Sequence, residues 1–553
     1  MNTVSVTVQG KDPLIVAKGT LVSQVLPSVC SNGQRVLGAI VNNMVVSLVT
    51  PLHVDAKVEP LTFSDAYGWS IYRNTLCFLL AKVCHELNPA IDCRVRNSLG
   101  SGFYCTLEEP EGDLPDNPEV IAKLKKSMDD LIRQDLPITM ETVSYESAVS
   151  LFKKTGQQDK LNLLEHRNPP FVLLSQCGGF SEISQQPLLP RLGLIHKFDL
   201  TPFEDGFLLR VPESAHPDTL PPLPSSKGVF QVYRKHIVWG RAIGISTVGD
   251  LNRAITSHQA DDFVRTVEAL HDKRLGEIAN QIASRPKVKL VLVAGPSSAG
   301  KTTFATRLCT HLRVNGLRPL LISTDNYFVG DARNPRDKDG NLDYEHLDAV
   351  DRPRLNSDMR RLMQREPVRM RSFDFARHDG YDQPFETKMD GNGIIVMEGI
   401  HSLNPDLTPD ILPEEKFLIY LNTLTQLGLD CSNRISTTDT RLVRRLVRDF
   451  HFRKRDPVDT LRMWPSVGRG ERRWIYPFQH LADAVFNSAL DYELAVLKPM
   501  ASILLNQIKP WHREYLVARR LSGMLHNFST LAADVVPGDS ILRETIGGSQ
   551  LNY

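Results

Sequence analysis

The residues best suited to chemistry stand together in the segment GPSSAGKTT, residues 295–303. An apolar run ends just before it at Ala294, and a helical pattern follows it. Glycines let the backbone turn its N–H groups toward phosphate oxygens, and a helix N-terminus adds partial positive charge at the same place. The ammonium group of Lys301 would then reach the β- and γ-phosphates of ATP, and the hydroxyl of Thr302 would bind Mg²⁺.

This segment predicts a P-loop, and the alternative is a chance match in a turn rich in glycine and serine. The strand before it and the helix after it are what a P-loop requires, so we prefer the phosphate-binding interpretation. The predicted ATP-binding residues are Gly295, Ser297, Ser298, Ala299, Gly300, Lys301, Thr302 and Thr303.

Two carboxylates follow apolar runs downstream of this segment. Asp325 comes after the run 320–323, and Glu398 closes the run 394–397. In an open α/β sheet, ligands bind beyond the carboxyl ends of the strands. Asp325 would therefore lie near the γ-phosphate and accept the proton of an attacking hydroxyl, although an Asp-Asn pair is also a common turn former. Glu398 would hold Mg²⁺ together with Thr302, or it is an ordinary carboxylate at a strand end.

A basic helix is predicted over residues 441–455, where seven of fifteen residues are lysine or arginine. Arginines that close over a triphosphate neutralise charge in the transition state of phosphoryl transfer. A solvated basic face and an RNA-binding patch are the competing interpretations. Beside a P-loop we prefer the catalytic one.

Composition limits the class of protein. The chain has 553 residues with 41% apolar residues, 23% charged residues and a net charge of +1, which is typical of globular domains without a global basic field. Its length predicts two to four domains. There is no apolar run of about 18 residues, no basic or apolar leader, no CxxC pair among the eight cysteines, and no two histidines four residues apart. We therefore expect a cytoplasmic protein without a membrane span, disulfide framework or zinc site.

The apolar patterns predict an α/β protein with several parts. Residues 1–62 alternate like half-buried strands and form a small β-rich module, and residues 66–225 are mixed α/β. The proline-rich run 212–224 ends that part, and residues 226–284 hold a linker and a long helix. Residues 285–553 alternate strands with helices, which predicts a doubly wound parallel sheet. The ending 546–549 is either a tail that packs near the active site or a frayed terminus.

The downstream segments resemble the uridine kinase branch of the phosphoribulokinase/uridine kinase family. The resemblance rests on the P-loop and on five further segments, which read STDNYF, YEHLDAVD (344–351), FDFARH (373–378), MEGIH and the arginine-rich helix. It implies that Asp325 is the base for a nucleoside 5′-hydroxyl and that Glu345 meets the ribose. It further implies acceptor contacts from Tyr327, Phe328, Phe373, His378 and Arg445, and catalytic phosphate contacts from Lys301, Arg448 and Arg453.

Four departures from the family pattern fall in the acceptor pocket. Glu345 stands in place of aspartate, Phe373 in place of tyrosine, and Leu347 in place of proline, while Tyr327 and Phe328 occur in reversed order. Sites built on hydrogen bonds discriminate strongly, so these changes bear on which acceptor is used.

The N-terminal half resembles threonyl-tRNA synthetases. Residues 1–62 are similar to a TGS (β-grasp) domain, and residues 66–225 to the editing-type domain that follows it. The synthetase pattern has an HxxxH helix, but the corresponding segment 71–77 has no histidine. The resemblance therefore implies contact with RNA as an option, without hydrolytic editing.

Together these resemblances imply an ATP- and Mg²⁺-dependent nucleoside kinase of pyrimidine salvage. It would convert uridine or cytidine into the nucleoside monophosphate and release ADP. One alternative is a kinase of another small alcohol, such as a sugar phosphate or a pantothenate-like molecule. The other is an RNA-associated ATPase that senses nucleotides. Kinases of this kind often self-associate, so a homo-oligomer is a further expectation.

Overall fold

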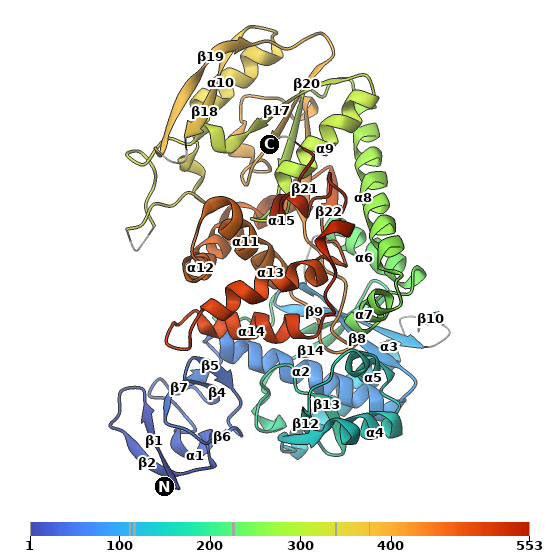
Figure 1. Cartoon of the computed structure of the whole chain (residues 1–553), viewed down its shortest axis with the longest axis vertical. Coiled ribbons are helices and arrows are strands. Elements are labelled where there is room, and N and C mark those ends of the chain that lie inside the picture. Colours follow the sequence, from blue (N-terminus) through green and yellow to red (C-terminus); the bar gives the residue numbers. More distant parts are fainter. Residues whose placement is uncertain are drawn as a thin grey trace.

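The computed structural model describes residues 2–109, 112–113, 118–223, 227–337, 340–374 and 377–551. The chain begins at one end of the molecule in a five-stranded sheet with the order β2-β1-β7-β4-β5 (Figure 1). Its elements are β1 (Thr3–Val8), β2 (Leu14–Ala17), β3 (Thr20–Leu21), α1 (Val22–Val25), β4 (Val36–Val41), β5 (Met44–Val46), β6 (Pro51–Leu52) and β7 (Ala56–Thr62). The alternation that predicted the first strand is confirmed, because Val4, Val6 and Val8 are buried.

The second part is mixed α/β, as predicted. The long helix α2 packs on the strands β10-β9-β15-β14, and a three-stranded sheet β11-β12-β13 lies beside them. Its elements are α2 (Ala66–Leu87), β8 (Asp92–Leu99), β9 (Gly102–Glu109), β10 (Gly112–Asp113), α3 (Pro118–Gln134), β11 (Thr139–Ser144), α4 (Tyr145–Thr155), α5 (Gln158–Glu165), β12 (Phe171–Cys177), β13 (Phe180–Ile183), β14 (Asp199–Phe203) and β15 (Gly206–Arg210). The predicted boundary at 225 lies outside the described residues.

Three helices connect this part to the next: α6 (Lys227–Ala242), α7 (Val248–Thr256) and α8 (Ala260–Ala283). The helix predicted over 260–284 is therefore present, and Figure 1 shows α8 running along the outside of the last part. Most of its predicted apolar stripe is buried, including Val264, Val267 and Leu275.

The last part contains a five-stranded, all-parallel sheet with the order β17-β20-β16-β21-β22. One face packs on α8 and α9 through Leu275 and Leu308, and the other packs on α10 through Leu355. This is the predicted doubly wound arrangement. The elements are β16 (Leu290–Ala294), α9 (Lys301–Val314), β17 (Arg318–Ser323), α10 (Arg352–Met363), β18 (Val368–Asp374), β19 (Asp379–Thr387), β20 (Gly393–Glu398), β21 (Lys416–Asn422), α11 (Thr437–Arg453), α12 (Pro457–Trp474), β22 (Ala484–Asn487), α13 (Glu493–Gln507), α14 (Tyr515–His526) and α15 (Arg543–Ile546).

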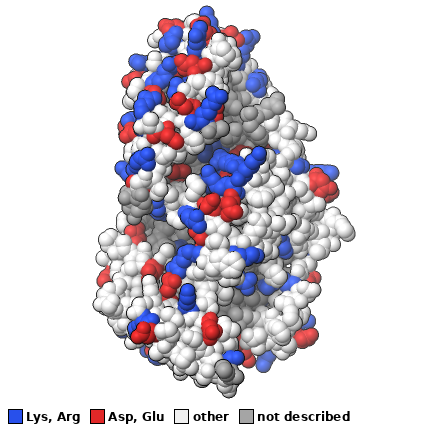
Figure 2. All heavy atoms as spheres, turned by 60° about the vertical axis from the view of Figure 1, so that its left-hand side comes forward, with Lys and Arg blue, Asp and Glu red and all other residues white. Residues whose placement is uncertain are grey.

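Charged side chains are distributed unevenly over the surface. Figure 2 shows both signs crowded together over the upper end of the molecule, where Figure 1 places α10, β18 and β19. The two signs lie side by side because arginines of these elements pair with exposed acids, as in the pairs Arg361–Glu366 and Arg354–Asp382. Such interspersed charge agrees with the net charge of +1.

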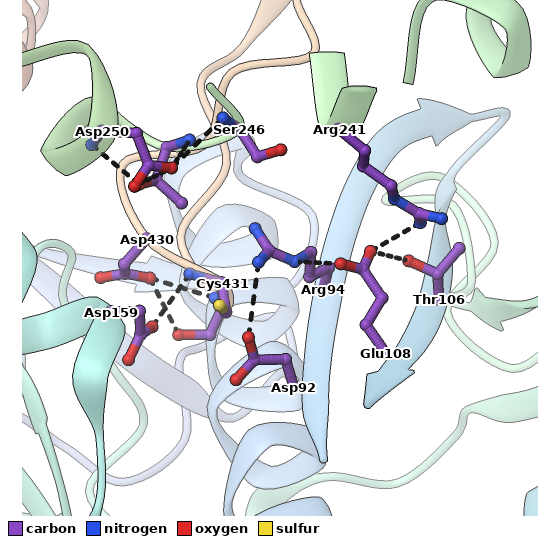
Figure 3. A network of polar contacts seen from close by, with 12 residues as sticks. Asp92, Arg94, Thr106, Glu108, Asp159, Arg241, Ser246, Asp250, Asp430 and Cys431 are labelled. Carbon is purple, nitrogen blue, oxygen red and sulfur yellow. Dashed lines mark hydrogen bonds and ion pairs between the residues drawn. The ribbon is translucent and has the colours of Figure 1, made fainter. Parts of the chain in front are cut away.

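The loop between β21 and α11 enters the N-terminal half and is held there by a buried polar network (Figure 3). The N–H of Cys431 donates to Asp159, and the carbonyl of Cys431 accepts from the N–H of Val95. The Lys160 ammonium lies 3.2 Å from Glu182 and 3.0 Å from Asp430, which comes from the loop. The N-terminal half therefore fixes the segment that leads into the arginine-rich helix α11.

Lys160 is expected to stabilise this interface strongly. Its side chain is 2% exposed, and although burial alone would lower its pKa, Asp159, Asp430 and Glu182 raise the pKa well above its usual range. Lys160→Met would leave buried carboxylates without their cation, so we expect a loss of ~3–5 kcal/mol in the free energy of unfolding. Urea denaturation checks this. Lys154→Met, at an exposed position of α4, should stay within about 0.5 kcal/mol of the parent.

Candidate nucleotide and acceptor site

The P-loop is built as the sequence predicted, between the end of β16 at Ala294 and the start of α9 at Lys301. Gly300 has a φ of +83°, in the left-handed region that favours glycine. Gly295 has no room for a side chain, because a Cβ there would lie 2.7 Å from the carbonyl oxygen of Leu421 on the neighbouring strand. Glycines are thus required at both ends of the loop.

The polar groups of the loop fit a phosphate. The hydroxyl of Ser298 is buried and has no hydrogen-bond partner within the described ranges. The Nζ of Lys301 donates to the carbonyl of Pro296 at 3.4 Å, so its side chain folds back along the loop. The first N–H groups of α9 have no partner within the helix, and they give its N-terminus, next to the loop, a partial positive charge. Together these groups can bind an anion.

Asp325 and Glu398 lie at the carboxyl ends of adjacent strands, as predicted. Ser323 pairs with Glu398 in the β17–β20 register, and Asp325 follows in the 3₁₀ turn Thr324–Tyr327. Burial and, after it, the charge of Asp325 raise the pKa of Glu398 to about 7. A cation would offset this repulsion. Glu398, together with the hydroxyl of Thr302, therefore fits Mg²⁺, which commonly uses one or two protein carboxylates plus phosphate oxygens.

The pKa of Asp325 is also raised by burial, while Lys301, Arg453 and Arg448 act in the opposite direction. A carboxylate with a raised pKa accepts a proton more readily than an ordinary aspartate. Asp325 is thus close enough to the P-loop lysine and two arginines of α11 for their charges to lower its pKa. These are four of the predicted site residues.

The arginines of α11 divide into two groups. Arg441 and Arg444 are each 2% exposed and form buried ion pairs with Glu471 and Glu493, so they do not face a triphosphate. The others surround Asp449, whose side chain is 0% exposed. These are Arg445, Arg448, Arg453 and Arg455. One carboxylate among four guanidinium groups leaves a net positive charge at this face of the helix.

Arg445 lies at the P-loop as well as near the predicted acceptor residues. Its Nη1 donates to the hydroxyl of Ser297 at 2.7 Å. Burial lowers the pKa of Arg445, and the carboxylates of Asp449 and Glu345 partly offset this. Arg445 thus connects the phosphate side of the site to Glu345.

The predicted acceptor aromatics form one cluster, with one exception. The ring of Phe328 lies 5.6 Å from the rings of both Phe373 and Tyr344, and the hydroxyl of Tyr344 is 3.0 Å from Nδ1 of His378. Tyr327 is fully buried, and its hydroxyl donates to Asp358 at 3.2 Å. Tyr327 therefore shares the apolar core of Phe328 and Phe373, but its hydroxyl is directed to Asp358 on α10. Residues 375–376 of the FDFARH segment lie outside the described residues.

Glu345 lies between the P-loop and a cavity of about 420 Å³. The pKa of Glu345 is raised to about 7, and burial is the largest cause. Glu471 and Asp325 also raise this pKa, whereas Arg445 and Lys301 lower it. A Cβ at Gly470 would lie 2.5 Å from Cβ of Glu345, so only glycine fits beside it. The cavity is lined by Pro335, Arg336, Asp337, Asp343, His346, Ser466, Arg469, Gly470, Arg473 and Trp474.

Three residues of this region were not found by sequence reasoning. Glu471 accepts from the N–H of Ser297 at 3.1 Å and from both terminal nitrogens of Arg441 at 2.7 Å. Asp449 organises the arginines, and Tyr344 joins the aromatic cluster. Tyr344 and Asp449 stand inside the quoted motifs, whereas nothing around Glu471 in the sequence distinguishes it from a surface glutamate.

The helix α2, which corresponds to the histidine-bearing helix of the synthetase pattern, carries an arginine between aromatic rings. The guanidinium of Arg73 lies 4.2 Å from the ring centroid of Trp69 and 4.1 Å from that of Phe103. In the described part of the chain no group of three or more His, Cys, Asp or Glu residues could hold a metal ion. The helices described here also include none that is long and apolar enough to cross a bilayer.

A parallel sheet with a P-loop after its central strand, and carboxylates at the adjacent strand ends, defines a P-loop nucleotide-binding domain. Residues 290–495 match the model of the family described as "Phosphoribulokinase / Uridine kinase family", so this part of the chain is a domain of that family.

The N-terminal half matches a different class of protein. The threonine–tRNA ligase of Syntrophotalea carbinolica is 30% identical over 199 residues, which cover 34% of this chain and 30% of that protein. The ligase of Desulforamulus reducens is 27% identical over 186 residues, or 33% of this chain and 29% of that protein. The chain thus spans under a third of the length of these curated relatives.

Among solved structures, a possible uridine kinase from Bacillus stearothermophilus aligns with 16% identity and a TM-score of 0.28, covering 39% of this chain and 98% of that one. A putative fructose transport system kinase from Silicibacter sp. TM1040 aligns with 15% identity and a TM-score of 0.29, covering 38% and 98%.

Proposed function

We propose that the protein is an ATP-dependent kinase that phosphorylates the 5′-hydroxyl of a nucleoside, with uridine or cytidine as the preferred acceptor. The observation that carries this proposal is the position of Asp325, a half-buried carboxylate just after the end of β17, whose pKa is raised by burial and lowered in part by the P-loop lysine and two arginines. A nucleotide-binding loop alone needs no such base. A hydroxyl-activating carboxylate beside it is what phosphoryl transfer to an alcohol requires.

The reaction follows from these positions. Asp325 accepts the proton of the acceptor hydroxyl while the hydroxyl oxygen bonds to the γ-phosphorus. At the same time the bond between that phosphorus and the bridging oxygen of ADP breaks. Lys301, Arg448 and Arg453 stabilise the negative charge on the transferring group and on the leaving ADP. Mg²⁺ held by Thr302 and Glu398 would neutralise charge on the triphosphate.

The acceptor side supports a nucleoside. Glu345 offers a carboxylate for ribose hydroxyls, and the cluster of Phe328, Phe373 and Tyr344 offers apolar surface for a planar ring. The cavity beside Glu345 falls within the 300–1,000 Å³ range of ligand pockets. Its three arginines would equally suit an anionic alcohol, so a sugar phosphate is the second acceptor class to test.

The test is to measure ADP release with ATP, Mg²⁺ and a panel of nucleosides, sugar phosphates and other alcohols, for the parent and for Asp325→Ala and Lys301→Ala. Release that depends on uridine or cytidine and disappears in both variants supports the proposal. ADP release that occurs only with a non-nucleoside would keep the kinase reaction but assign it a different acceptor. Hydrolysis without an acceptor, unchanged in Asp325→Ala, contradicts the kinase and favours a nucleotide sensor.

We also propose a cytoplasmic location and leave RNA as a partner to be tested. All eight cysteines are free thiols, which suits a reducing compartment. The similarity of the N-terminal half to threonine–tRNA ligases is the one observation in favour of RNA. Filter binding of tRNA over a range of salt concentrations would test it, because phosphate contacts make affinity fall with salt.

The acceptor step should depend on pH near neutrality through Glu345. Its pKa of about 7 means that the carboxylate is mostly protonated at pH 6 and mostly ionised at pH 8. Only the ionised form can accept hydrogen bonds at both oxygens, so we expect kcat/KM for the acceptor to rise about tenfold over this interval. Glu345→Gln should flatten that rise.

The contribution of Glu345 to the free energy of unfolding decreases as pH rises, whereas kcat/KM is expected to increase. Since its folded pKa lies above the usual value of 4.5, protonation stabilises the fold below that value and the benefit is lost as pH rises through 7. If kcat/KM for the acceptor rises with pH in Glu345→Gln as it does in the parent, the assignment of this rise to Glu345 is wrong. The KM for ATP serves as the internal control.

A further inference from the structure

The C-terminal segment, residues 540–548, lies against the P-loop. Ile541 is 1% exposed and packs in the same core as Ala299, Phe304 and Ala305. A Cβ at Gly300 would lie 2.4 Å from Cγ2 of Ile541, so the loop glycine and this side chain are in close contact. These contacts, made by a residue shortly before the ending 546–549, favour the expectation of a tail that packs near the site.

This segment brings one carboxylate, Glu544, onto two predicted phosphate-binding side chains. The hydroxyl of Thr303 donates to Oε2 of Glu544 at 3.0 Å. The Nη1 of Arg448 lies 3.6 Å from Oε1 of the same carboxylate. Its charge also contributes to the raised pKa of Glu398, after burial and Asp325.

A carboxylate and a phosphate present the same kind of acceptor oxygen to a hydroxyl and a guanidinium. We propose that Glu544 is a further residue of the nucleotide site, which binds Thr303 and Arg448 when no nucleotide is bound and is exchanged for phosphate oxygens when one binds. The inference rests on the proposed function only in requiring that the P-loop binds a nucleotide.

The exchange predicts the direction in which loss of the Glu544 charge changes nucleotide affinity. A bound polyphosphate must compete with Glu544 for Thr303 and Arg448, and it must also tolerate a like charge nearby. Arg448 keeps a second partner in Asp449, at 3.2 Å, so it remains paired throughout. Removing the Glu544 charge should therefore strengthen phosphate binding. If Glu544 merely supported the loop, its removal would weaken binding instead.

The experiment is calorimetric titration of adenosine, ADP and ATP, without acceptor, into the full chain and its Glu544→Gln and Glu544→Ala variants. We expect Kd for ADP and ATP to fall about fivefold in both variants, while Kd for adenosine stays unchanged. Glu544→Asp keeps the charge and should lie closer to the parent. Asp539→Asn, at an exposed position of the same stretch, is the matched control and should equal the parent.

Unchanged or weaker binding of ADP and ATP in the folded variants overturns the inference. Parallel weakening of all three ligands with a lower Tm shows a supporting role and also overturns it, and if Glu544→Ala does not fold, the isosteric Gln variant decides. A parent that binds ATP but phosphorylates no acceptor contradicts the proposed function alone. Absence of ADP and ATP binding in both parent and variants contradicts both.

Discussion

Asp325→Asn should lower kcat by about 10²–10⁴-fold, the range for loss of a general base, while the Kd for ATP changes little. The amide has nearly the same size as the carboxylate but cannot take the proton of the acceptor hydroxyl. Asp325 follows the end of β17, beside Glu398 at the end of the adjacent strand, and Lys301, Arg453 and Arg448 all lower its pKa, so we expect it to lie near the γ-phosphate. Steady-state kinetics and ATP titration on the same preparation measure the two quantities.

The control for this prediction is Asp410→Asn, at an exposed position outside the site. It should retain parental kcat and Kd. A variant at Asp325 that loses ATP binding in parallel with kcat would indicate a structural or metal-binding role. A variant with parental kcat would exclude Asp325 as the base.

Arg441→Met should lower the free energy of unfolding by about 3–5 kcal/mol, the cost of leaving a buried charge without its partner. Arg441 and Glu471 form a bidentate pair at 2.7 Å, and their side chains are 2% and 3% exposed. Without Arg441, the carboxylate of Glu471 keeps only the N–H of Ser297 and the hydroxyl of Tyr476 as neutral partners.

The same variant should weaken ATP binding, because Glu471 joins α12 to the P-loop backbone at Ser297. Arg472→Ala, at the exposed neighbouring position of α12, is the matched control and should change neither quantity. Chemical denaturation and calorimetry measure them. A loss below about 1 kcal/mol would show that the pair is replaceable, as some buried ion pairs are.

The P-loop and the strand-end carboxylates could be predicted because their signals are local. Gly295, Gly300 and Lys301 stand at fixed spacing between a strand and a helix, and Asp325 and Glu398 directly follow apolar runs. The order of these elements predicted the parallel sheet. Topology rules then place the carboxyl ends of its strands together at one edge.

The rest of the site could not be predicted because it depends on contacts between distant residues. Glu471 is 174 residues from Ser297, and Glu544 is 241 residues from Thr303. The buried arginines illustrate the same limit. Arg441 and Arg444 look like solvent-facing positions of a basic helix, and only the positions of Glu471 and Glu493 explain why they are buried.

Tyr327 and Phe328 are neighbours in the segment after Asp325 and pack in the same apolar core, but they have different partners. Phe328 meets Phe373, whereas Tyr327 reaches Asp358 on α10. The sequence contains no signal that would distinguish the two orientations.

The largest apolar core contains residues from both halves of the chain. Phe152 and Leu174 of the synthetase-like half pack in the same cluster as Leu427, Leu446 and Leu504 of the kinase half. A gene broken between the halves would encode two products, each with a wide apolar face exposed to water. Each half therefore depends on the other for burial of its apolar surface, so we expect the two halves to unfold together.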